Sequence, residues 1–145
     1  MIRSLFAVAL LALSACYSLK TNEPKTAWEQ ACAHSTYSCR GVKEPLVVEA
    51  DLADRIYGEY FPGTKHVIIT VGLHEPKRTL VLAHEMTHYL QWVHKMTSMD
   101  DSKAVRCERE KEAFDVSYAV SIELGVPDTR WQDIAFVYGC PLNLG

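Results

Sequence analysis

The segment KRTLVLAHEMTHYLQWVHKM, residues 77–96, carries a long helical pattern. Its apolar residues, among them Leu80, Ala83 and Leu90, recur at three- and four-residue spacing and cover more than one face. Pro76 stands just before the segment, where a proline suits the start of a helix. We therefore predict a helix over residues 77–96 that is apolar on more than one side.

Polar residues interrupt this helix at HEMTH, residues 84–88. His84 and His88 stand four residues apart, so both imidazoles project from one face of a helix and can reach one tetrahedral zinc ion. Histidine and glutamate without a partner would be costly to bury inside an apolar helix. The motif therefore predicts one zinc ion per chain, bound by His84 and His88, with Glu85 beside it.

The HExxH pattern resembles that of the zincin metallopeptidases, which also place a β-rich strand shortly before the motif helix. The resemblance implies hydrolysis of peptide bonds by a zinc-bound water. Glu85 would act as the general base, taking the proton of that water and passing it to the leaving amine.

The third ligand is expected on a second helix, over residues 103–124. Its Glu112-Ala113 pair resembles the gluzincins, in which a glutamate from a following helix completes a His-His-Glu site. On a helix, Glu112 shares a face with Val105, Val116, Ala119 and Val120. An inward carboxylate needs a cation, which makes Glu112 the predicted ligand. Glu108 is the alternative ligand or a support for a zinc histidine, whereas Glu110 is expected on a solvated face.

A metzincin-like site is the competing interpretation. His94 lies ten residues after His84, where HExxHxxGxxH families place a third histidine. Those families need glycine at the position of Gln91, because the helix breaks there in a left-handed conformation that strains other residues. We therefore favour the gluzincin arrangement and keep His94 as an alternative ligand.

The remaining segments predict an α+β fold with a small sheet packed on the motif helix and the second helix. Together with the resemblance to zincins, this implies a minimal zincin-like domain. A short helix is expected over residues 27–34 and strands over residues 46–48 and 66–71. Residues 50–58 suggest one or two helical turns, and residues 60–63 a tight turn. An extended substrate would pair with the edge of the strand at residues 67–71.

The N-terminal residues 1–15, MIRSLFAVALLALSA, have the basic start and short apolar run of a signal peptide. Leu13-Ser14-Ala15-Cys16 resembles the lipobox of bacterial lipoproteins, which implies cleavage before Cys16 and a lipid anchor on its sulfur. Tyr17 follows, so the periplasmic face of the outer membrane is the expected address in a Gram-negative host. Residues 16–26 form a tether and residues 27–145 one domain.

Four of the five cysteines remain after Cys16. An even number of thiols in an exported domain predicts two disulfides, with three connectivities open. The local pair Cys32 and Cys39 is favoured because it closes a short polar loop. Cys107 and Cys140 would then form the second bridge.

Two functions are compatible with these features. The first is a zinc metallopeptidase at the cell envelope, acting on peptides, proteins or peptidoglycan cross-links. The alternative is a non-catalytic lipoprotein, stabilised by zinc, that binds a partner. The net charge of −3 and the lack of a basic block do not suggest nucleic acid as a partner.

Overall fold

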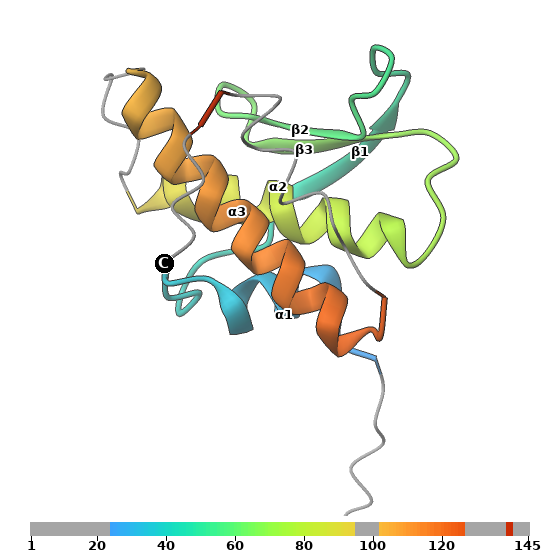
Figure 1. Cartoon of the computed structure of the whole chain (residues 1–145), viewed down its shortest axis with the longest axis horizontal. Coiled ribbons are helices and arrows are strands. Elements are labelled where there is room, and N and C mark those ends of the chain that lie inside the picture. The colour runs from blue at the N-terminus through green and yellow to red at the C-terminus, as the bar shows by residue number, and fades with distance from the viewer. Residues whose placement is uncertain (1–23, 95–101, 127–138, 141–145) are drawn as a thin grey trace, which may run out of the picture.

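The computed structural model describes residues 24–94, 102–126 and 139–140, and these residues form an α+β fold (Figure 1). The predicted class, a small sheet packed with helices, is confirmed. Along the chain the elements are α1 (Ala27–His34), β1 (Leu46–Ala50), β2 (Gly58–Phe61), β3 (His66–Thr70), α2 (Lys77–Val93) and α3 (Lys103–Glu123).

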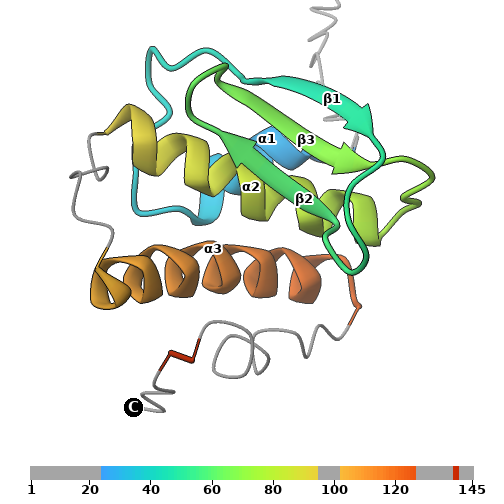
Figure 2. The ribbon, with the colours of Figure 1, turned by 90° about the horizontal axis from the view of Figure 1, so that it is seen from above.

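The sheet has the strand order β1-β3-β2. β1 runs parallel to β3, with Leu46 opposite His66, and β2 runs antiparallel to it, with Phe61 opposite the same His66 (Figure 2). β3 is therefore the central strand, so the prediction that a substrate pairs with its edge is wrong. In the described part of the chain, β2 is the edge strand that lies next to α2, the helix that carries HEMTH at residues 84–88.

The predicted helical turns over residues 50–58 are also wrong, because this segment leads into β2. Ile56 N–H donates to the carbonyl of Ala53, 3.0 Å away, in a single turn, and Arg55 has a φ of 69°. That left-handed residue is incompatible with a continuing helix. The expected turn at residues 60–63 begins two residues later than predicted, since Tyr60 and Phe61 belong to the strand.

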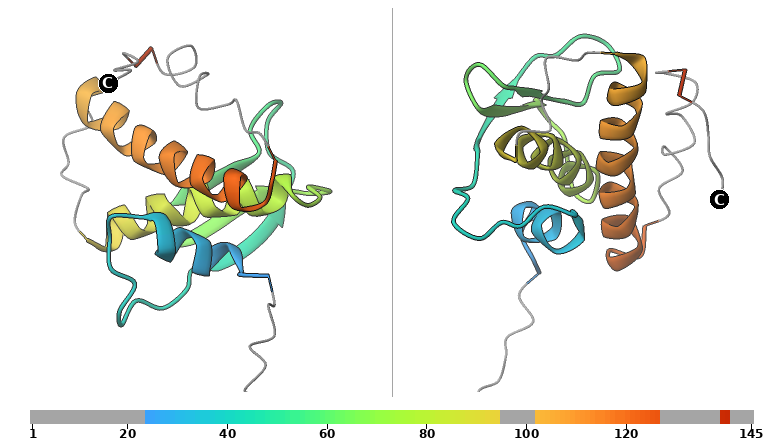
Figure 3. Two further views of the ribbon diagram at one scale, coloured as in Figure 1. Left: turned by 60° about the horizontal axis from the view of Figure 1, so that its bottom comes forward. Right: turned by 90° about the vertical axis from the view of Figure 1, so that its left-hand side faces the viewer.

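The central element is α2, which lies between the sheet, α1 and α3 (Figure 3, right-hand view). Val67 and Ile69 of β3 pack on Leu82 and Met86 of this helix. On another side, two small or apolar residues of α2 pack against two valines of α3, in a cluster of Leu80, Ala83, Val116 and Val120. Contacts on several sides explain why the apolar residues of α2 cover more than one face.

The ends of the helices follow local sequence signals. Thr26 caps α1 in a capping box with Glu29. Ser102 accepts a hydrogen bond from Val105 N–H at the start of α3. Gly125, with a φ of 67°, follows the end of α3, as expected for a helix that stops at glycine.

Two disulfides join Cys32 to Cys39 and Cys107 to Cys140, which confirms the favoured pairing. Such bridges are typical of exported proteins in oxidising compartments. Among the described residues, every helix is too short or too polar to cross a membrane. The predicted signal peptide, Cys16 and most of the tether lie outside the described residues, and the predicted domain limits stay a prediction.

Candidate metal centre

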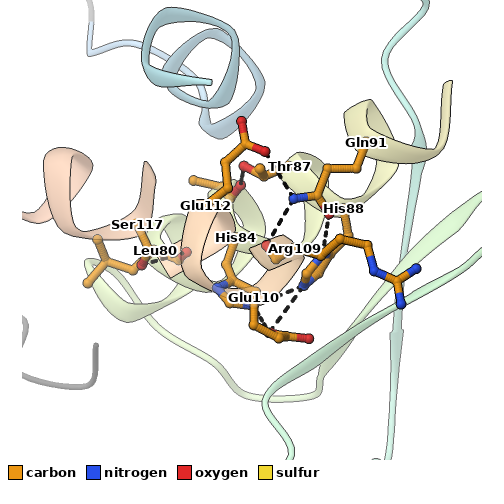
Figure 4. A network of polar contacts seen from close by, with 10 residues as sticks. Leu80, His84, Thr87, His88, Gln91, Arg109, Glu110, Glu112 and Ser117 are labelled. Atoms are coloured by element: carbon orange, nitrogen blue, oxygen red, sulfur yellow. Dashed lines mark hydrogen bonds and ion pairs between the residues drawn. The ribbon is translucent and has the colours of Figure 1, made fainter. Parts of the chain in front are cut away.

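Three side chains from two helices meet at one point. His84 and His88 project from one face of α2, and their Nε2 atoms lie 3.2 Å apart. The Oε2 atom of Glu110, on α3, lies 3.4 Å from Nε2 of His84 and 3.5 Å from Nε2 of His88. Figure 4 shows the three side chains turned toward one another. This group could hold a metal ion.

The spacing of these three atoms fits a tetrahedral ion. Ligands about 2.0–2.1 Å from a tetrahedral zinc lie about 3.3–3.4 Å from one another. The observed separations of 3.2, 3.4 and 3.5 Å are close to that edge length. Oε2 of Glu110 is also buried without a hydrogen-bond partner, a costly state that a cation would relieve. Two imidazoles and a carboxylate form a donor set that suits zinc.

The structure places Glu110, and not the predicted ligand Glu112, beside the two histidines. The carboxylates of Glu110 and Glu112 leave α3 in opposite directions (Figure 4). Glu112 accepts hydrogen bonds from Thr36 and Gln91, and it is not part of the group at the two histidines. Glu110 was expected on a solvated face, yet only 14% of its side-chain surface is exposed. Glu108, the alternative ligand, is exposed on α3 and also lies outside the group.

His94 does not join the two histidines either. It caps the C-terminal end of α2, where its Nε2 lies 2.8 Å from the carbonyl oxygen of Ser38. Its ring stacks on that of Tyr37, with 5.4 Å between the ring centroids. The helix continues through Gln91 without the break that a metzincin-like site requires. The described residues therefore favour the His-His-Glu arrangement.

Phe114 was not predicted at the site, yet its ring meets that of His84 edge to face, at a centroid distance of 4.5 Å. It lies one turn after Glu110 on α3, so both residues face α2. The ring therefore packs against the imidazole of His84 and limits its orientation. The spacing of four residues between Glu110 and Phe114 is the sequence signal that could have identified this face.

The electrostatics of the site favour positive charge. Burial acts to lower the pKa of His88, but contact with Glu110 and the negative charges of Glu85 and Glu110 raise it to about 9. Burial acts to raise the pKa of Glu110, yet its contacts with the two histidines hold this pKa well below its ordinary value. The carboxylates thus stabilise positive charge at the point where the imidazoles meet.

Glu85 is buried next to this point, with 7% of its surface exposed. Burial raises the pKa of its carboxyl, the histidines act against the rise, and the negative charges of Glu110 and Glu59 add to it. A carboxylate with a raised pKa accepts a proton more readily near neutral pH. The position and the raised pKa of Glu85 suit the role of a general base.

The three side chains and Glu85 line a cavity of about 390 Å³ between α2, α3 and β2. This volume lies in the lower part of the range for small-molecule or peptide-binding pockets. The walls come from the strand and the loops around it, and from both helices. The lining residues are Ile56, Gly58, Glu59, Tyr60, Pro62, His84, Glu85, His88, Gln91, Trp92, Arg109 and Glu110.

Gly58 allows β2 to approach the motif helix closely. A Cβ atom at this position would lie 2.6 Å from Cγ1 of Val81 and 2.8 Å from Cγ of Glu85. These distances are far below van der Waals contact, so a side chain here would displace the strand or Glu85. The sequence interpretation assigned Gly58 only to the end of a helical turn and missed this role.

We expect Gly58→Ala to lower the free energy of unfolding by about 1–3 kcal/mol, as overpacking of a close contact does. Gly63→Ala is the matched control, because a Cβ atom at Gly63 would meet no atom within 4 Å. Chemical denaturation of both variants measures the difference. An unchanged midpoint for Gly58→Ala would contradict the close packing of β2 on α2.

Fold and site together define an α+β domain with a candidate His-His-Glu metal centre in a cavity. Comparisons of the chain with protein-family models, with curated proteins and with solved structures gave no match. The function is therefore inferred from the geometry of the site.

Proposed function

We propose that this chain is a zinc-dependent metallopeptidase that acts at the bacterial cell envelope. The observation that carries the proposal is the spacing of His84, His88 and Glu110, whose ligand atoms lie 3.2–3.5 Å apart at the wall of a cavity. Three protein ligands beside an open space are typical of catalytic zinc, whereas structural zinc has four. The HExxH motif adds the resemblance to zincins of the gluzincin kind.

A zinc ion held by these three residues would supply a Lewis acid that makes water nucleophilic near neutral pH. Glu85 lies next to the first histidine and lines the same cavity. Its carboxylate would take a proton from the attacking water and deliver it to the leaving nitrogen, so that one peptide bond and one water become a carboxylate and an amine. Burial raises the pKa of Glu85 and so strengthens it as a base.

The edge strand β2 is the surface we propose for the substrate. Gly58, Glu59 and Tyr60 line the cavity, and β2 pairs with β3 on its other side. An extended peptide could add to this edge through backbone hydrogen bonds, which would lay one peptide bond across the site. Because such bonds are independent of side chains, we expect cleavage of unstructured peptides of varied sequence.

The site of action is proposed from the N-terminal sequence and the disulfides. The Leu13-Ser14-Ala15-Cys16 lipobox would attach the domain to a membrane through a short tether. Envelope proteins and peptidoglycan peptides are then the substrates within reach. Disulfides at Cys32–Cys39 and Cys107–Cys140 are in keeping with an exported domain.

The test is a peptidase assay on the chain exported from a bacterial host, so that both disulfides form. Zinc-loaded protein and chelator-treated protein would be incubated with casein and with a library of quenched fluorescent peptides. We expect cleavage that the chelator removes and added zinc restores. Zinc binding without cleavage of any substrate would favour the non-catalytic binding module instead.

A further inference from the structure

Gln91 is a buried amide with a fixed orientation. Only 1% of its surface is exposed, and it lies one helical turn after His88. Its Nε2 donates to the backbone carbonyl of Arg109, 2.9 Å away, and to Oε2 of Glu112, 3.2 Å away. Both of these partners are acceptors only. The amide nitrogen must therefore face α3, and the amide oxygen must face His88.

This orientation determines the tautomer of His88. Oε1 of Gln91 lies 2.9 Å from Nδ1 of His88. Because an amide oxygen can only accept, Nδ1 must carry the hydrogen of this contact. The lone pair of the neutral ring is then on Nε2, the atom that faces His84 and Glu110. Gln91 thus prepares His88 to bind a cation through Nε2.

Glu112 in turn holds Gln91 and is itself held by the disulfide loop. Its Oε1 accepts hydrogen bonds from Thr36, from the backbone N–H at 3.2 Å and from the hydroxyl at 2.5 Å. Thr36 lies inside the loop that the Cys32–Cys39 disulfide closes. A continuous series of contacts therefore runs from this loop through Glu112 and Gln91 to His88. Figure 4 shows the part from Glu112 to His88.

The loop has a second attachment beside the first. Tyr37 stacks on His94, and the carbonyl of Ser38 lies 2.8 Å from Nε2 of the same histidine. Residues 36–38 are consequently tied to α3 through Glu112 and to the end of α2 through His94. The loop is thus placed to keep the two helices in register at the point where His88 and Glu110 meet.

We propose that Gln91 and Glu112 are positioning residues that fix the tautomer and ring orientation of His88 for metal binding, and that the Cys32–Cys39 loop anchors them through Thr36. This inference rests on the proposed zinc site and extends it. Partners of this kind behind a metal ligand change metal affinity by about 10–100-fold. The inference also explains why the carboxylate of Glu112 points inward without a cation, because hydrogen bonds from Thr36 and Gln91 satisfy it.

The first test measures the zinc dissociation constant by competition with a chromophoric chelator. Gln91→Met keeps the size of the side chain but removes the amide, so we expect zinc affinity to fall about 10–100-fold. Thr36→Val removes only the hydroxyl at an exposed position, and we expect a smaller loss in the same direction. Glu108→Ala, exposed on the same helix as Glu112, is the control and should bind like the wild type.

Wild-type affinity in Gln91→Met would overturn the inference while leaving the proposed function in place. A wild-type chain that binds no zinc would overturn the proposed function and this inference with it.

A second measurement needs no variant. Nitrogen chemical shifts of the zinc-loaded wild type should show His88 protonated at Nδ1 and bound through Nε2. Binding through Nδ1 would overturn the role assigned to Gln91.

Discussion

Glu110→Ala should reduce zinc affinity by more than about a hundredfold, beyond the cost of losing a residue that only supports a ligand. The substitution removes the carboxylate that lies next to both His84 and His88. Two histidines alone would leave the ion with half of a tetrahedral set. Competition with a chromophoric chelator measures the change, and circular dichroism checks that the variant is folded.

The controls separate the ligand from its neighbours. Glu108→Ala is expected to bind zinc like the wild type, and His94→Ala to show at most a small loss like that of Thr36→Val, since neither residue belongs to the group around the two Nε2 atoms. The zinc affinity of Glu112→Ala should lie between those of the wild type and Glu110→Ala, because a positioning residue is expected to cause a smaller loss. If Glu112→Ala lost zinc completely and Glu110→Ala kept it, the ligand assignment from the structure would be wrong.

Glu85→Gln should lower kcat by about 10²–10⁴-fold while the protein still binds one zinc ion. The amide has nearly the shape of the carboxylate, so the close contact with Gly58 is preserved. It cannot accept a proton at neutral pH, so the proton of the attacking water has no base. Because burial penalises a charged group at this position, the neutral amide should not destabilise the fold.

Rates with a quenched peptide and zinc content by elemental analysis test this second expectation together. Activity that survives in Glu85→Gln would refute the role of Glu85 as the general base. Loss of both zinc and activity would instead indicate that Glu85 supports the metal site. A parallel Glu108→Gln variant is the control, because Glu108 is exposed on α3 and lies outside the group at the two histidines.

Much of the fold could be predicted from local patterns. Helices α1, α2 and α3 begin at the predicted residues, and Thr26, Pro76 and Ser102 stand at their starts in the structure. The strand predicted over residues 66–71 is present as β3, His66–Thr70. β2 was missed because GEYF, residues 58–61, is short and has a glycine, and its pairing with β3 depends on contacts distant in sequence.

The site was predicted in part, and the error lies in the extent of the buried face of α3, which is wider than its apolar residues indicate. The sequence interpretation placed the inward face along its valines, which brought Glu112 toward the core. In the structure the buried face also includes Ser117 and Ser121. Ser117 donates to the carbonyl of Leu80, 3.4 Å away on α2, and Ser121 to that of Tyr118 at 2.7 Å.

Small hydroxyl residues can be buried where two helices pack closely, because backbone carbonyls satisfy their donors. With the serines counted as inward, Glu110, Ala113, Ser117 and Ser121 form a stripe at three- and four-residue spacing, and Glu110 faces α2. A pattern based on apolar residues alone could not distinguish this face from the neighbouring one. The choice of ligand therefore required the packing of α3 on α2.

The central claim is that His84, His88 and Glu110 hold one metal ion, and anomalous diffraction at the zinc absorption edge tests it most directly. Crystals of the full chain grown with zinc should show one strong peak about 2 Å from Nε2 of both histidines and from a carboxylate oxygen of Glu110. A peak at Glu112 or His94 in place of Glu110, or no peak near the two histidines, would contradict the account.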